Sequence, residues 1–152
     1  MRALEVTSHD IAPALVDQPV PAPRAGEVRL RILACGLNFA DLLMVKGTYQ
    51  DTPPLPFVPG LEVCGIVDAL GPDTDGPAIG TRVAVVGGSG GLAEMGCFPA
   101  DRCVPVPDAM PAEVAAGFVI AYGTSHVALT HKARLQPGER LVVLGAAGGV
   151  GL

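Results

Sequence analysis

The sequence predicts a mainly β domain with short helices, followed by the opening strand of an α/β unit. Two observations lead to this prediction. Short apolar or alternating runs are separated by turn residues over the first two thirds of the chain, which has 20 glycines and 15 prolines in 152 residues. After Pro107 the pattern becomes helical, and the apolar run Leu141–Leu144 then leads into a glycine-rich stretch. Strands followed by helices and then a new strand indicate two successive domains.

The strand predictions come first along the chain. In the segment 26–34, Val28, Leu30 and Ile32 alternate with charged residues, as in a strand with one buried face. In the segment 60–70, Gly65 interrupts an apolar run and indicates a bulge or a close backbone approach. The remaining predicted strands are 1–7, 13–18, 81–86 and short strands within 93–106.

Two regions show helical features. Asn38 is a good N-cap, with Asp41 three residues later, and Gly47 is suited to end a helix. We therefore predict a short helix between Asn38 and Gly47. A second helical region begins at Pro111, because proline suits the first helical position. We expect Gly123 to divide this region into two helices, the second over 124–132.

The C-terminal stretch predicts a nucleotide site. Leu141–Leu144 has the continuous apolar character of a buried parallel strand, and it opens into Gly145–Gly151. Small residues after a strand let the backbone approach a pyrophosphate, and amides at a helix start bind the anion. The spacing is Ala146-x-Gly148-x-x-Gly151, with alanine at the first glycine of the usual pattern. The alternative is a strand with a flexible tail. We expect the chain to be a fragment that stops in the first turn of this helix.

Composition excludes several classes of function. The formal net charge is −5 and no basic block occurs, so nucleic acid is not an expected partner. No signal-like segment and no apolar run of membrane-spanning length is seen, so we expect a cytoplasmic protein without membrane contact. The four cysteines show no CxxC spacing and fit a reducing compartment.

Six short blocks together resemble the medium-chain dehydrogenase/reductase superfamily, and within it the zinc-free quinone oxidoreductase branch with its zeta-crystallin-like proteins. They occur in family order along nearly the whole chain: Asn38–Asp41, Gly47–Tyr49, Pro59–Gly65, Gly80–Val83, Ala121–Ser125 and Leu141–Gly151. The resemblance implies a GroES-like β-barrel over residues 1–118, the catalytic or substrate domain. It also implies that 119–152 begin a dinucleotide-binding Rossmann domain, truncated in the phosphate loop.

The resemblance also implies that no zinc is bound. Asn38 stands where zinc-dependent relatives have a cysteine, and Leu61 stands where they have a histidine. A catalytic zinc needs three protein ligands, and the chain's three histidines, His9, His126 and His131, lack companion ligands at workable spacing. We therefore predict no metal site.

Three residues are candidate catalytic groups. Tyr49 can donate a hydrogen bond to a developing oxyanion, although it can equally be an aromatic residue at the rim of a loop. The resemblance places Asn38 beside a nicotinamide or its ribose and Asp41 near the cleft; the alternatives are a helix cap and a first-turn dipole partner. Leu43 stands where many relatives have a second tyrosine, so a mechanism with two phenols is not expected.

The cofactor-binding candidates include one further helix residue. Thr124 resembles a family contact on the nicotinamide side, and its alternative role is a helix cap. The full predicted set is Asn38, Thr124, Ala146, Gly148, Gly149, Val150 and Gly151. Glu62 lies within an apolar strand, and we expect it to face solvent or to pair with Arg82 or another cation, in a structural role.

The resemblance implies an NADPH-dependent reductase, with NADH as an alternative, that reduces quinones or other conjugated carbonyls by direct hydride transfer without zinc. The parent protein is expected to be a homodimer, and this chain alone is expected to be inactive. Two alternatives remain: an enoyl-thioester reductase, which shares the scaffold, and a non-enzymatic GroES-like interaction module.

Overall fold

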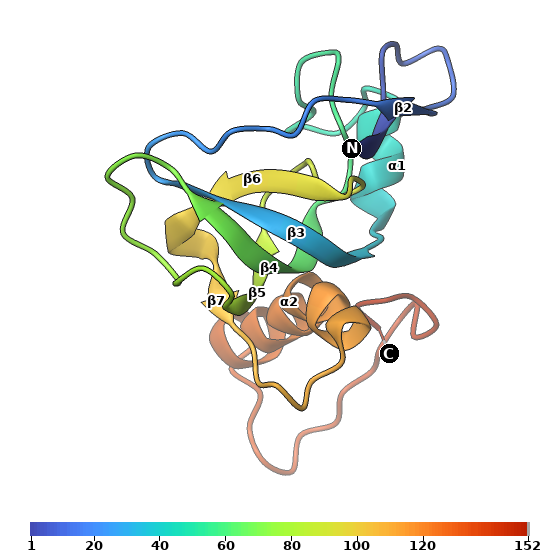
Figure 1. The fold of residues 1–152 in the computed structure, drawn as a ribbon. Coiled ribbons are helices and arrows are strands. Elements are labelled where there is room, and N and C mark those ends of the chain that lie inside the picture. Colours follow the sequence, from blue (N-terminus) through green and yellow to red (C-terminus); the bar gives the residue numbers. More distant parts are fainter. Residues whose placement is uncertain (152) are drawn as a thin grey trace.

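The structure, a computed structural model, describes residues 1–151, so Leu152 lies outside the described part. A two-stranded hairpin and a five-stranded antiparallel sheet form the β part, and the sheet has the order β6-β3-β4-β5-β7 (Figure 1). The strands are β1 (Arg2–Glu5), β2 (Ala14–Asp17), β3 (Glu27–Gly36), β4 (Glu62–Leu70), β5 (Arg82–Val86), β6 (Met95–Pro99) and β7 (Val104–Pro105). The helices are α1 (Phe39–Val45), α2 (Ala112–His126), the 3-10 turn Ala100–Arg102 and the π-helical segment Val127–Lys132. The predicted mainly β fold with short helices is confirmed.

Strands β3 and β4 form the centre of the sheet. They are antiparallel, with register shifts between Arg29 and Leu30 and between Ile32 and Ala34. Gly65 lies opposite Ile32, and a Cβ added to Gly65 would lie 2.8 Å from the carbonyl oxygen of Arg31. The glycine is therefore needed for the close backbone approach that the sequence predicts here.

Two apolar clusters stabilise the fold. The main cluster consists of fully buried side chains from four strands of the sheet: Val28, Leu30, Val63, Val67, Val83, Val85 and Phe98. A smaller cluster, Val6, Met44, Phe57 and Leu61, joins the hairpin, α1 and the loop before β4. Each such side chain contributes about 1.5–3 kcal/mol through burial, so the second cluster is what fixes α1 against the end of the hairpin and the loop before β4.

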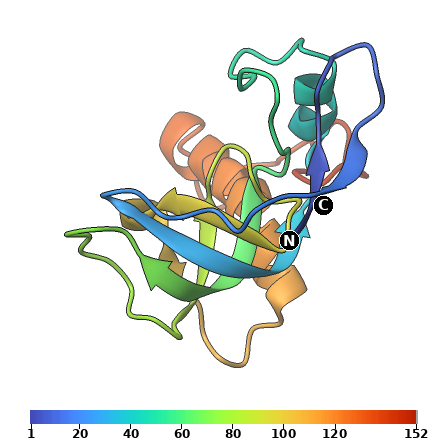
Figure 2. The same ribbon diagram turned by 45° about the horizontal axis from the view of Figure 1, so that its top comes forward.

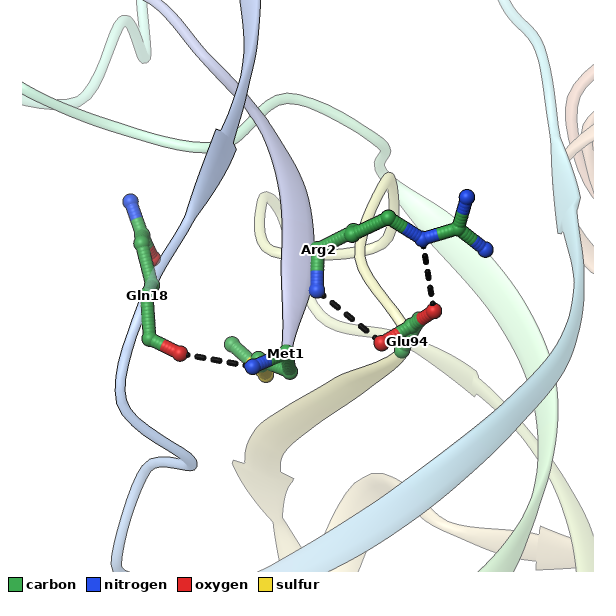
Figure 3. A network of polar contacts seen from close by, with 4 residues as sticks. All are labelled: Met1, Arg2, Gln18 and Glu94. Carbon is green, nitrogen blue, oxygen red and sulfur yellow. Dashed lines mark hydrogen bonds and ion pairs between the residues drawn. The ribbon is translucent and has the colours of Figure 1, made fainter.

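Polar contacts near the N-terminus close the hairpin and attach it to the residue before β6 (Figure 3). The N-terminal ammonium group donates to the carbonyl oxygen of Gln18 at 2.7 Å. The backbone N–H and the Nε of Arg2 donate to the two carboxylate oxygens of Glu94, each at 2.9 Å. Because this ion pair is exposed, it contributes to alignment more than to stability.

Helix α2 covers one side of the sheet, beneath β3, β4 and β5 in Figure 1, and Figure 2 shows the same contact from another direction. Ala115 and Ala116 are buried against Cys64, so small side chains let the helix approach closely. At the end of β3, a Cβ on Gly36 would lie 2.5 Å from the carbonyl oxygen of Ala116. Gly36 therefore has no room for any side chain.

The prediction that Gly123 divides the second helical region is wrong. Helix α2 runs through Gly123 to His126 and continues directly into the segment Val127–Lys132. A helical glycine costs only about 1 kcal/mol relative to alanine, which is too little to break a helix of this length. Residue 118, the predicted domain boundary, lies inside α2.

The prediction of a buried strand over Leu141–Leu144 also differs from the structure. The four residues are exposed and irregular, with Leu144 at 90% exposure. A parallel strand needs a hydrogen-bonded neighbour, and no strand within residues 1–151 pairs with this segment. The glycine-rich loop that follows consists of turns closed by bonds from the Gly148 N–H to the Gly145 oxygen and from the Gly151 N–H to the Gly148 oxygen, both 2.9 Å.

By length and composition, one helical stretch is apolar enough to cross a membrane. It is Ala112–Lys132, with 21 residues and a mean hydropathy of 1.2, which the sequence analysis did not anticipate. Ala115 and Ala116 of this stretch are buried against Cys64 of the sheet, whereas only 11% of its most apolar part is buried as a whole.

Candidate functional site

The start of α1 is fixed by a buried carboxylate. Asp41 is only 5% exposed, and both of its oxygens accept backbone N–H groups. Oδ2 accepts from Asn38 at 2.8 Å, and Oδ1 accepts from Gly60 at 2.9 Å. Asp41 thereby joins the first turn of α1 to the loop that leads into β4. Both oxygens are engaged, so a catalytic contribution from Asp41 stays a prediction.

Asn38 forms the N-cap of α1 with an extended backbone, as the sequence predicts. Its side-chain Nδ2 donates to Oε1 of Glu62 at 3.0 Å. The other carboxylate oxygen of Glu62, Oε2, accepts the backbone N–H of Ile120 in α2 at 3.0 Å. One carboxylate therefore connects α1, β4 and α2.

Glu62 is buried, with 3% of its surface exposed. The prediction that it faces solvent or pairs with Arg82 is wrong. In the register of β4 and β5, Arg82 lies opposite Ile66, four residues or about 13 Å along the strand from Glu62. The Arg82 guanidinium instead donates to the carbonyl oxygen of Pro107. Among residues 1–151 Glu62 forms no ion pair, and hydrogen bonds alone satisfy it.

A pocket of about 390 Å³ with a mixed lining lies where β3, α1, α2 and the glycine-rich loop meet, and we call it the polar pocket because polar side chains line part of it. Its lining includes Asn38, Glu62, Tyr122, Gly149 and Val150. The structure thus brings Asn38 together with two further predicted cofactor residues, Gly149 and Val150, which lie more than 100 positions later in the sequence. The hydroxyl of Ser125 in α2 lies 3.0 Å from the Val150 carbonyl oxygen and 3.1 Å from that of Ala121, and it can donate its one proton to either, so it links the loop to α2 at this edge of the pocket.

An apolar pocket of about 510 Å³ lies on the other side of Asn38. It is bounded by α1, the hairpin and the loops next to them, with Leu4, Leu37, Phe39, Leu42, Pro59 and Leu92 among the lining residues. The side chain of Phe39 is 74% exposed here. Leu37, Asn38 and Phe39 line both pockets, so this segment forms the wall between them, and Asn38 is its polar residue.

Two of the predicted site residues are placed elsewhere. Tyr49 follows the C-terminal end of α1 and packs against the cluster around Met44, and it lines neither of the two pockets. Thr124 is exposed within α2, in a separate shallow groove with Val119 and Val127. Because α2 is continuous at Thr124, its alternative role as a helix cap is wrong. The roles of both residues in catalysis and cofactor binding stay predictions.

The phosphate-loop residues form an exposed tight coil, not the start of a helix. The N–H groups of Gly148 and Gly151 are used within the loop, as described above. Gly149 has open space where a Cβ would be, so the backbone there is accessible from outside. Binding by Ala146, Gly148 and Gly151 stays a prediction.

The cysteines show no sign of reactivity. Burial, with a smaller contribution from the carboxylates of Asp41 and Glu62, raises the pKa of Cys35 to about 12. Burial likewise raises the pKa of Cys103 to about 11. Such thiols stay protonated at neutral pH and are poor nucleophiles. Within residues 1–151 no group of three metal-ligating side chains is found.

Two features of the site were missed in the sequence. The first is the hydrogen bond between Glu62 and Asn38. An acidic residue inside an apolar run indicates that the carboxylate has a partner, but the sequence does not show which residue that partner is. The second is the exposed aromatic pair of Phe118 and Tyr122, whose rings stack at 4.8 Å with an interplanar angle of 10°. The spacing of four residues along a helix is the signal that would have found this pair.

Comparison with known proteins identifies the family. The model of the alcohol dehydrogenase GroES-like domain matches residues 24–108. The quinone oxidoreductase-like protein 2 homolog of Nematostella vectensis is 42% identical over 127 residues, which are 83% of this chain and 35% of that protein.

Solved structures agree with this assignment. The human synaptic vesicle membrane protein VAT-1 homolog-like protein superposes with a TM-score of 0.92 at 37% identity, covering 99% of this chain and 50% of that one. The quinone oxidoreductase of Thermus thermophilus, described together with its NADPH complex, gives 0.86 at 38%, covering 99% and 46%.

The chain spans about a third of the length of the curated relatives that it matches, and about half of the solved structures. The solved structures superpose over 99% of this chain, so the fold is shared along its length. The chain belongs to the alcohol dehydrogenase GroES-like domain family, in the quinone oxidoreductase branch of the medium-chain dehydrogenases/reductases.

Proposed function

We propose that the protein to which this chain belongs is an NADPH-dependent reductase of quinones or other conjugated carbonyls. In this proposal the chain supplies the substrate side of the active site and the first phosphate-binding loop. The observation that carries it is the position of Asn38, the polar residue of the segment Leu37–Phe39 that separates an apolar pocket from a polar pocket that the glycine-rich loop also lines. A hydride donor and an apolar acceptor need such adjoining sites.

The residues of the polar pocket fit the nicotinamide end of a dinucleotide. Asn38 supplies a polar amide, and Tyr122 supplies an exposed aromatic face beside Gly149, which has no side chain to obstruct a ligand. When bound, NADPH would supply the hydride, and the substrate's own conjugated carbonyl would accept the electron pair. The chain's residues orient the two partners and exclude water from between them.

The apolar pocket supports an uncharged acceptor. Its lining is dominated by leucine, proline and phenylalanine side chains, and Asp41 already uses both oxygens for backbone N–H groups. Such a lining favours a quinone or enone body over a charged thioester carrier. The solved quinone oxidoreductase described with NADPH is consistent with the same cofactor here.

The test uses the intact protein with its complete nucleotide-binding domain. Oxidation of NADPH is followed with a small quinone and, separately, with an enoyl thioester. We expect faster turnover with the quinone and an at least about fivefold lower kcat/KM for Asn38→Ala, since one polar contact within the site contributes about 1–3 kcal/mol. The matched control is Asp51→Ala, on an exposed loop.

Other results would assign another function. Turnover of the enoyl thioester alone would make the protein an enoyl-thioester reductase. A folded intact protein that neither binds nor oxidises NADPH would overturn the proposal and favour an interaction module.

A further inference from the structure

Glu62 is a buried carboxylate that the proposed function leaves without a role. Its two oxygens contact Asn38 Nδ2 and the Ile120 N–H, and no cation within residues 1–151 forms an ion pair with it. We propose that Glu62 is a positioning residue that fixes the polarity of Asn38, so that Asn38 presents a hydrogen-bond acceptor to the polar pocket. The inference rests on the proposed function only for the identity of the ligand.

The chemistry of the two side chains sets this polarity. An ionised carboxylate only accepts hydrogen bonds, so the atom of Asn38 that faces Glu62 at 3.0 Å has to be the donating amide nitrogen. The amide oxygen of Asn38 then lies on the side away from Glu62. This oxygen has two lone pairs, so it can serve the helix cap and still accept from a ligand.

The second contact of Glu62 prevents the arrangement from inverting. Oε2 accepts the Ile120 N–H at 3.0 Å, which anchors the carboxylate to α2 on the side away from Asn38. The backbone of Gly36 lies directly against the Glu62 carboxylate, since a Cβ added to Gly36 would lie 2.7 Å from Oε1. The carboxylate is therefore confined, and the Asn38 amide has one orientation.

This polarity defines the ligand group that Asn38 contacts. The acceptor oxygen selects a donor, such as a ribose hydroxyl, over a carbonyl oxygen or a developing oxyanion. Asn38 would accordingly bind the cofactor, and stabilisation of the substrate's negative charge would come from another group.

A charge-conserving exchange of the two residues tests the inference. In Glu62→Gln the single oxygen is needed by the Ile120 N–H, so the new amide nitrogen faces Asn38 and forces it to turn its own nitrogen toward the pocket. Asn38→Asp alone places two carboxylates about 3 Å apart, at the distance of the present bond. In the double variant, the carboxylate introduced at position 38 accepts from the amide introduced at position 62 and again presents an oxygen to the pocket. Only the double variant restores the acceptor with the original net charge.

We expect each single variant of the intact protein to bind NADPH at least about fivefold more weakly, as for one mismatched, partly buried hydrogen bond. The double variant is expected to return to within about threefold of the wild type. A purely structural role for Glu62 predicts instead that Glu62→Gln, which keeps a hydrogen bond to each partner, binds NADPH as tightly as the wild type. A Glu62→Gln protein that binds as tightly as the wild type, or a double variant as weak as the single ones, would overturn the inference.

A measurement without cofactor separates this inference from the proposed function. In the 152-residue chain, the side-chain amide protons of Asn38 are expected to exchange with solvent slowly in NMR spectra, and at least about tenfold faster in Glu62→Gln. If the intact wild type failed to bind NADPH, the proposed function would fall while slow exchange still supported the positioning role. Fast exchange of these protons in the wild type would refute that role whatever the cofactor does.

Discussion

Replacing Asp41 by alanine is expected to destabilise the chain by about 2–4 kcal/mol. Asp41 is 5% exposed and satisfies the N–H groups of Asn38 and Gly60, at 2.8 and 2.9 Å. Each buried donor left without an acceptor costs about 1–3 kcal/mol, and the cost is smaller at Asn38 because that residue is half-buried. For a chain of this size the loss corresponds to a fall in Tm of roughly 5–15 °C.

The assay is urea unfolding of the chain followed by circular dichroism, with thermal unfolding as a second probe. Asp41→Asn is expected to fall between the wild type and Asp41→Ala, because an amide has one oxygen for two donors. Asp51→Ala is the control, since Asp51 is exposed on the following loop. A free energy of unfolding for Asp41→Ala within about 0.5 kcal/mol of the wild type would refute the reasoning, because that is the usual range for surface substitutions.

Two further predictions test packing and thiol chemistry. Gly36→Ala is expected to lower the free energy of unfolding by about 1–3 kcal/mol, because its Cβ would lie 2.5 Å from the Ala116 oxygen. Gly117→Ala, at an open helical position, is expected to raise the free energy of unfolding by up to about 1 kcal/mol. Equal effects of the two substitutions in urea titrations would contradict this account. The pKa of Cys35, raised from 9.0 to about 12, makes the folded state favour the protonated thiol, so stability is complete below pH 9 and falls as the pH rises toward 12. Cys35→Ser is expected to flatten this part of the stability curve, and an unchanged slope would show that the thiol is not buried as described.

The strands were predictable because their signal is local. The alternation of apolar and charged residues in β3 and the N-cap of α1 can each be recognised from consecutive residues. The structure has both elements near the expected positions. Helix α2 was predicted to end too early, because a glycine's cost of about 1 kcal/mol is small beside the packing of Ala115 and Ala116 on the sheet.

Other features could not be predicted because they depend on distant partners. Leu141–Leu144 has the composition of a buried strand, but a parallel strand forms only beside another strand. For Glu62, the sequence showed that a buried acid needs a partner, but only the fold shows that Asn38 and a backbone N–H of α2 provide it. The pocket that joins Asn38 to Gly149 and Val150 depends in the same way on how the chain returns across α2.

The central claim is that Asn38, held by Glu62, is the point where the cofactor and substrate sites meet. A crystal structure of the intact protein with NADPH tests this most directly. The account predicts a hydrogen-bond donor of the nicotinamide riboside at the Asn38 side-chain oxygen, with Glu62 still bonded to the nitrogen. A cofactor that leaves the Asn38 side chain without contact, or a metal ion bound beside it, would contradict the account.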